Sequence, residues 1–202
     1  MRVLPLEYGV ASFVLPGQQE SGDRHLICPN QDGVLIAVID GLGHGEEAAN
    51  AAKVASSILE ADRDEPIISL VERCHQQLRE TRGVVLSLAA IDVAHGMMTW
   101  LGIGNVQGLL TRAGAPKGAI QEILMLRGGV VGSQLPPLQA AVLPVRREDT
   151  VIFVTDGIRR GFSESLSSLE GPQRAADRIL ESYRSGTDDA LVLIARLTEI
   201  RS

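Results

Sequence analysis

The sequence predicts one α+β domain in which helices cover antiparallel β-sheets, formed by residues 1–202. First, residues 84–126 form a succession of short branched apolar runs divided by glycine-containing turns. Strands joined by such short links pair antiparallel, because parallel pairing needs a long crossover. Second, helical spacing is confined to two early segments and one late segment, so helices do not alternate with strands. Third, 202 residues with 45% hydrophobic content are enough to bury a sizeable core.

The first part of the chain is expected to form three strands followed by two helices. The apolar runs predict strands at 8–15, 24–28 and 34–39, with a hairpin turn at 31–33. Glu46 and Glu47 suit the first turn of a helix, where negative charge is favourable. A stripe of small residues at helical spacing then marks a helix face that can pack closely on a sheet. Pro66 is expected to begin the second helix, which ends near residue 83.

The remaining elements are mainly strands. Pro172 is placed to begin a third helix that runs to about residue 183. Residues 163–169 are expected to form a loop or a short helix. The predicted strands are 84–91, 97–103, 106–111, 120–126, 142–145, 151–155 and 190–197.

Composition excludes several classes of function. A net charge of −6 and an aromatic content of 3% argue against nucleic-acid binding, which needs basic surface and stacking side chains. No apolar run approaches the roughly 20 residues that span a bilayer, and the first residues lack a signal-peptide pattern. We therefore expect a cytoplasmic protein without membrane partners. Cys28 and Cys74 are expected to be buried free thiols, and no cysteine or histidine spacing indicates zinc.

Carboxylates stand at the ends of three apolar runs that are far apart in the sequence. Asp40 and Asp156 each follow such a run, and Asp188 and Asp189 directly precede the last one. If these strands are neighbours, the carboxylates converge and repel one another unless cations offset their charge. Oxygen ligands favour Mg²⁺ or Mn²⁺ over zinc. The pattern predicts a shared acidic metal site.

Two other sites fit the sequence less well. The glycines at 41, 43 and 45 do not make a dinucleotide fingerprint, because Glu46 occupies the third glycine position. A Ser-His-Asp triad lacks its Gly-x-Ser-x-Gly elbow. His44 is the histidine nearest the acidic residues in sequence, although a solvated loop histidine is the more common case. Arginines 24, 159 and 160 could hold a phosphate through a bidentate fork, but solvated surface arginines are the commoner description.

Four motifs together resemble the PP2C type of metal-dependent protein phosphatase, and more narrowly its SpoIIE-like branch. They are Ser21-Gly22-Asp23, the turn at 40–45, Thr155-Asp156-Gly157 and Asp188-Asp189. Their order covers almost the whole chain. The segments 102–106 and 128–132 resemble the RsbX-type stressosome phosphatases in particular. The resemblance implies an α-β-β-α sandwich of two antiparallel β-sheets flanked by helices.

The resemblance also implies a set of site residues. Asp40, Asp156 and Asp188 would be catalytic ligands of two Mn²⁺ or Mg²⁺ ions, with Gly41 supplying a backbone carbonyl. Asp23 would contribute directly or through water. Asp189 is a further candidate metal ligand, and which of Asp188 and Asp189 ligates directly stays open. Arg24 and His44 are candidates for substrate binding. Leu191 departs from the family, which usually has threonine or serine there, and the chain has no room for a large flap segment.

The implied activity is that of a metal-dependent serine/threonine protein phosphatase. Its substrates would be phosphorylated STAS-domain proteins of the stressosome in stress-response signalling. Two alternatives stay open, namely a catalytically silent scaffold that binds phosphoproteins and a small-molecule phosphohydrolase that uses the same metals.

Overall fold

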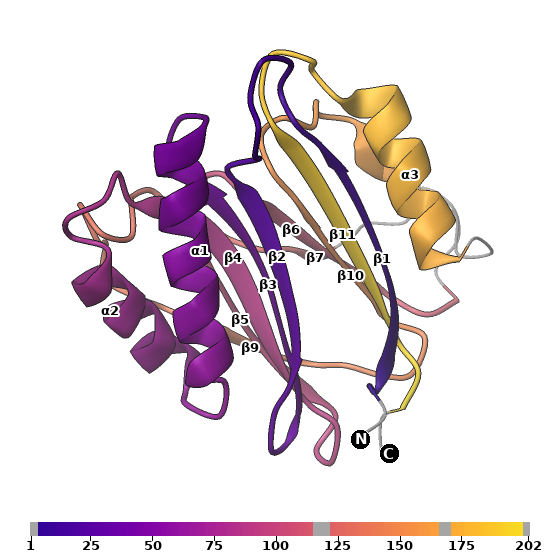
Figure 1. Ribbon diagram of the computed structural model, residues 1–202. Helices are drawn as coiled ribbons and strands as arrows, with labels where there is room; N and C mark the ends of the chain where they lie inside the picture. The colour runs from indigo at the N-terminus through magenta and orange to yellow at the C-terminus, as the bar shows by residue number, and fades with distance from the viewer. Residues whose placement is uncertain (1–3, 115–121, 166–170, 200–202) are drawn as a thin grey trace.

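Two β-sheets pack face to face in the computed structural model, which describes residues 4–114, 122–165 and 171–199. The first sheet has the strand order β1-β11-β10-β6-β7 and the second has the order β2-β3-β4-β5-β8, with β9 also paired to β5. Figure 1 shows α1 and α2 over the outer face of the second sheet and α3 over the outer face of the first. This arrangement is the expected α-β-β-α sandwich.

The bounds of the elements agree with most of the expected ranges. The strands of the first sheet are β1 (Leu6–Phe13), β6 (Gln107–Thr111), β7 (Glu122–Ile123), β10 (Thr150–Val154) and β11 (Ala190–Leu197). Those of the second are β2 (Asp23–Pro29), β3 (Gly33–Gly41), β4 (Val84–Asp92), β5 (Met97–Ile103), β8 (Leu126–Arg127) and β9 (Ala141–Pro144). The helices are α1 (Glu46–Ala61), α2 (Ile67–Gln77), the 3-10 helix η1 (Phe162–Ser165) and α3 (Pro172–Tyr183).

Both faces of β3 are buried, which explains its continuous apolar run. Ile36 and Val38 contribute to the core between the sheets, whereas Leu35, Ala37 and Ile39 contribute to the core beneath α1 and α2. Successive strand residues point to opposite faces, so one run serves two cores. A third core lies between the first sheet and α3.

Small residues bring α1 close to the second sheet. The helix buries five alanines and Leu59. A Cβ at Gly41 would lie 2.1 Å from the carbonyl oxygen of Ala48, so glycine is required where β3 ends beside the helix. Close packing therefore fixes the first turn of α1 next to the end of β3.

The prediction of a single strand at 120–126 is wrong. Residues 120 and 121 lie outside the described ranges, and the rest splits into β7 in the first sheet and β8 in the second. Leu124, between them, is 4% exposed and packs in the core between the sheets, where it carries the chain from one sheet to the other. Because of this crossing, β8 pairs parallel with β5, while every other named strand pair is antiparallel.

Other differences are small. Pro66 caps α2 and does not begin it, and β1 starts two residues before the expected range. Residues 162–165 form η1, and the remainder of the expected loop lies outside the described ranges. Cys28 and Cys74 are buried and free, as expected. Within the described ranges, no helix combines the length and apolar character needed to cross a membrane. That residues 1–202 form one domain stays a prediction.

Candidate functional site

Asp23 and Asp40 lie directly opposite each other at the ends of β2 and β3. Directly opposed residues share one face of a sheet with Cβ atoms about 5 Å apart, and like charges at such positions repel. Asp40 is on the same face of β3 as Val38, which packs between the sheets. Both carboxylates therefore project into the space between the two sheets.

The other acidic residues come from the first sheet. Strands β10 and β11 pair antiparallel up to Val154 and Val192, so the end of β10 meets the start of β11. Asp156 follows β10, and Asp188 and Asp189 precede β11. Figure 1 shows the loops after β1, after β3 and before β11 at one end of the sandwich, opposite the chain termini. The expected convergence of the carboxylates is thus what the fold produces.

Thr155 connects the two sheets at this point. Its hydroxyl donates to Oδ2 of Asp23 at 2.7 Å and accepts a hydrogen bond from the Leu191 amide at 2.8 Å. Thr155 is 1% exposed and Asp23 is 8% exposed. A buried hydroxyl that uses both its donor and its acceptor has one defined orientation, and so has the carboxylate it contacts.

The neighbouring Asp188 and Asp189 differ in their surroundings. Asp189 is buried, and its two carboxylate oxygens accept backbone N–H groups from Leu15 at 2.8 Å and Gly22 at 2.7 Å. The Gly22 carbonyl in turn accepts the Gly41 amide. Asp189 therefore holds the loop after β1 against the site. Asp188 is only partly buried, and one of its oxygens accepts the Asp189 amide at 2.9 Å.

A pocket of about 310 Å³ opens between the ends of the sheets. Asn105 stands on its wall and donates from Nδ2 to Oδ2 of Asp156 at 2.7 Å. The residue before it, Gly104, has φ of 92° and passes so close to Val85 that a Cβ would clash. The residues that line the pocket are Asp40, Leu42, Gly43, Val85, Gly104, Asn105, Val130, Asp156 and Asp188.

The acidic residues raise one another's proton affinity. Burial, followed by the charges of Asp23, Asp156, Asp188 and Asp189, raises the pKa of Asp40 to about 9. Burial also raises the pKa of Asp23 to about 7; the Thr155 hydrogen bond opposes this shift, and the nearby carboxylates add to it.

The pKa of Asp156 is raised too, first by burial and then by the charge of Asp188. A cluster that holds protons this tightly in the protein alone is one that divalent cations would stabilise.

The donor set suits a hard cation. Three carboxylates line one pocket, and they are accompanied by an amide and by backbone groups. Oxygen donors are those that Mg²⁺ and Mn²⁺ prefer. Within residues 4–114, 122–165 and 171–199, no three His, Cys, Asp or Glu side chains are grouped closely enough to hold a metal ion by themselves. The pocket has room for waters beside the carboxylates, and Mg²⁺ usually keeps several.

The structure does not bring all the expected site residues to the pocket. Arg24 follows Asp23 on β2, so its side chain points to the opposite face, with Leu26 and α1. His44 is exposed, and its Nδ1 lies 3.2 Å from Nε2 of Gln18. Arg159 donates to backbone carbonyls at the end of α3. Gly41 follows Asp40 at the end of β3 but does not line the pocket.

Thr155 and Asn105 were not predicted as site residues from the sequence. Both stood inside motifs, one before Asp156 and one in the segment 102–106. Their roles depend on contacts across 132 residues for Thr155 and 51 residues for Asn105, which no local spacing reveals. A polar residue beside a predicted ligand is the signal that could have found them.

Replacing Thr155 with valine should destabilise the protein by about 1–3 kcal/mol, because the buried Asp23 carboxylate and the Leu191 amide each lose a partner. Thr111 provides the matched control, since its Oγ1 is buried without a partner among the described residues. Thr111→Val should be neutral or stabilising. Equilibrium unfolding in urea measures both variants, and equal destabilisation would show that the Thr155 bonds contribute nothing specific.

Comparison with known proteins agrees with this geometry. A family model described as Stage II sporulation protein E (SpoIIE) matches residues 30–198. The phosphoserine phosphatase RsbX of Bacillus subtilis (strain 168) is 29% identical over 94 residues, which are 46% of this chain and 47% of that protein. The alignment thus spans about half the length of that relative.

Two solved structures share the sandwich over nearly their whole length. A chain from work on the bacterial stressosome, described as a modular system adapted to control secondary messenger signalling, has a TM-score of 0.85 and 27% identity, with coverage of 95% of this chain and 99% of that one. RsbX in complex with magnesium has a TM-score of 0.84 and 20% identity, with 96% coverage of both chains. The expected PP2C-like sandwich is confirmed. Since the family model covers most of its length, the chain belongs to the SpoIIE family.

Proposed function

We propose that this protein is a metal-dependent phosphatase that hydrolyses phosphoserine or phosphothreonine in proteins. The observation that carries the proposal is the convergence of Asp40, Asp156 and Asp188 on one pocket, with Asp23 buried behind them. Membership of the SpoIIE family and the likeness to RsbX, itself named a phosphoserine phosphatase, support it.

Two Mn²⁺ or Mg²⁺ ions would be held by Asp40, Asp156 and Asp188, with the Gly41 carbonyl and Asp23 contributing directly or through water. When bound, such ions lower the pKa of a coordinated water and offset charge on the phosphoryl oxygens. Asn105 orients Asp156, and Thr155 orients Asp23, so the ligand positions are set before any ion arrives. This preorganisation is what positions a phosphoryl group for in-line attack.

Water is the expected nucleophile. The described residues that line the pocket include no hydroxyl, thiol or imidazole side chain, and their carboxylates would hold the cations. Leu42, Val85 and Val130 supply apolar wall, which strengthens electrostatic interactions inside the pocket. Product release then needs no second chemical step on the protein.

Activity should disappear in EDTA and return with Mn²⁺ or Mg²⁺ more than with Zn²⁺, because the ligands offered are oxygens. Turnover of a chromogenic phosphate ester and of a phosphoprotein, with and without each metal, measures this. Full activity in chelator would contradict the metal mechanism. Metal-dependent turnover of the ester alone would favour a small-molecule phosphohydrolase, and phosphoprotein binding without turnover of either would favour a scaffold.

We propose phosphorylated STAS-domain proteins of the stressosome as the substrates. The support is the relatedness to RsbX and to a structure from the bacterial stressosome. The pocket also suits a folded partner, since it is small and lies at the end of the sandwich, where the partner's own surface could complete its walls.

An intact phosphorylated STAS domain should be dephosphorylated with a kcat/KM at least about tenfold above that of a phosphopeptide from the same site, since one to a few added contacts are each worth about 1 kcal/mol. Parallel initial-rate measurements on the folded domain, its urea-unfolded form and the peptide decide this. Equal values for the peptide and the folded domain would remove the physical support for surface docking.

A further inference from the structure

Arg82, which was not predicted as a site residue from the sequence, lies against Gly43 at the edge of the pocket. It belongs to the connection from α2 to β4, where the Gly83 carbonyl accepts the Leu42 amide at 3.1 Å. Val84 then pairs with Gly41 at the start of β4. The backbone of Arg82 is thereby fastened beside the turn that follows Asp40.

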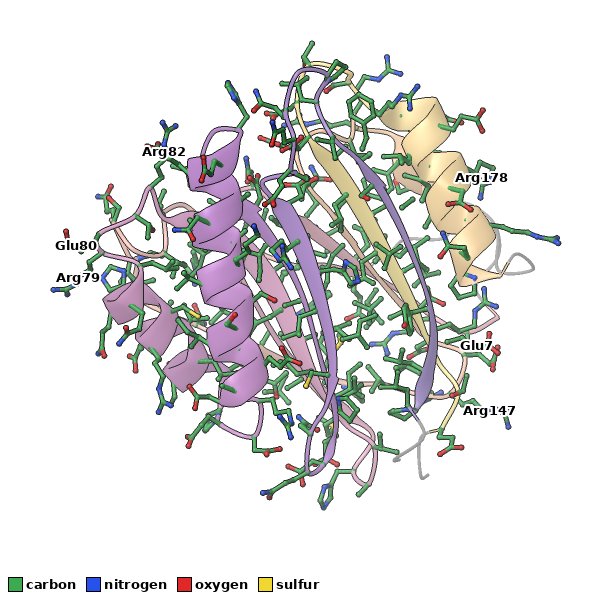
Figure 2. All side chains as sticks on the ribbon, in the orientation of Figure 1. Glu7, Arg79, Glu80, Arg82, Arg147 and Arg178 are labelled. Atoms are coloured by element: carbon green, nitrogen blue, oxygen red, sulfur yellow. The ribbon has the colours of Figure 1, made fainter. Side chains whose placement is uncertain are left out.

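The side chain of Arg82 is directed along this turn. Glu47, in the first turn of α1, forms an ion pair with its Nε. A Cβ placed on Gly43 would lie 2.8 Å from Nη1 of Arg82, so the guanidinium rests against Gly43. Gly43 itself lines the pocket and has φ of 87°, which favours glycine and leaves this space open. Figure 2 shows Arg82 beside the N-terminal end of α1.

The pocket is acidic, so a basic side chain beside it could help to bind an anionic substrate. The described residues that line it carry three carboxylates and no basic side chain. A phosphate monoester is an anion, and an arginine fork binds two of its oxygens better than a point charge does. Glu47 engages Nε, and Nη1 lies on the side of Gly43.

We propose that Arg82 binds the phosphoryl group of the substrate as it enters the pocket and holds it at the rim over Gly43. Glu47 acts as the positioning residue that keeps the guanidinium in place. This inference rests on the proposed phosphatase function, and it replaces Arg24, which faces α1, as the arginine for the substrate phosphate.

The test compares Arg82→Ala with Arg79→Ala in the full chain loaded with Mn²⁺. Arg79 is exposed three residues earlier, and its removal changes the net charge equally; Figure 2 shows it well away from Arg82. Two quantities are measured, namely the affinity for inorganic phosphate by calorimetry and the steady-state kinetics on a phosphoprotein. Thermal melts check that each variant is folded.

Arg82→Ala should weaken phosphate binding and raise KM by about 10- to 100-fold with kcat nearly unchanged, because the contact is made before and during the reaction. Arg82→Lys should have a phosphate affinity and a KM between those of the wild type and Arg82→Ala, since lysine keeps the charge but lacks the fork of the guanidinium. Arg79→Ala should match the wild type in both quantities.

Unchanged phosphate affinity in Arg82→Ala overturns the proposal. If KM for the phosphoprotein is nevertheless raised in that variant, Arg82 contacts the surface of the substrate protein and not its phosphoryl group. Wild-type protein that binds phosphate through Arg82 without turnover would contradict the phosphatase and leave the phosphate site standing.

Discussion

Asp40→Asn is expected to abolish activity while it stabilises the metal-free protein. Asparagine keeps the shape of the side chain but removes a charge that the cations require, so kcat should fall by at least about 100-fold. Without metal, ionisation of Asp40 is costly, because this partly buried carboxyl lies opposite Asp23 and near Asp156 and Asp188. Loss of the charge should raise the free energy of unfolding by about 1–3 kcal/mol near neutral pH.

The stabilisation should depend on pH with a defined sign. The pKa of Asp40 is about 9 in the folded protein and near 3.9 in an unfolded chain, so the folded state binds the proton more tightly. Its unfavourable contribution therefore grows as pH rises from about 4 to about 9. The advantage of Asp40→Asn over the wild type should be larger at pH 8 than at pH 4.5.

Thermal melts in chelator at both pH values measure this difference, and about 2–4 °C in Tm corresponds to 1 kcal/mol for a chain of this size. Asp32→Asn is the matched control, because Asp32 is exposed in the hairpin between β2 and β3, at the far end of the same strand. An Asp40→Asn variant that keeps most of its turnover would show that Asp40 serves only the turn. Added Mn²⁺ should stabilise the wild type more than the variant.

Asp188→Asn should lower activity and Asp189→Asn should lower stability, although the residues are adjacent. Asp188 lines the pocket, and an asparagine there can still accept the Asp189 amide, so the fold should be kept while activity falls at least about 100-fold. Asp189 accepts the Leu15 and Gly22 amides, and an asparagine offers one oxygen where two are needed. That variant should lose about 1–3 kcal/mol of stability.

Urea unfolding in chelator and kcat measured with saturating Mn²⁺ separate the two roles. The stability lost in Asp189→Asn should be accompanied by a loosened loop after β1, which limited proteolysis between β1 and β2 detects. If Asp188→Asn unfolds and Asp189→Asn is folded but inactive, the two roles are reversed: Asp189 would be the metal ligand and Asp188 would hold the loop after β1.

The sequence was sufficient for the elements whose pattern is local. Apolar runs predicted β3, β10 and β11 because burial on both faces leaves polar residues only near the strand ends, and small residues at helical spacing predicted α1. The strand expected at 120–126 failed because one short apolar run can serve two sheets, and only the burial of Leu124 between them decides where the chain crosses.

The acidic residues were likewise visible in the sequence, since a carboxylate at the end of a buried strand is costly without a partner. Their division of labour was decided only by tertiary contacts. Asp188 and Asp189 are indistinguishable in sequence. In the structure, Asp189 accepts hydrogen bonds from the loop after β1, whereas Asp188 lines the pocket. Arg24 was predicted to bind substrate because it follows Asp23, but strand alternation turns its side chain to the opposite face. Arg82, in the connection from α2 to β4, instead lies against Gly43, which lines the pocket. Spacing along the chain determines which residue types meet at a site, and the packing of distant loops determines which atoms face it.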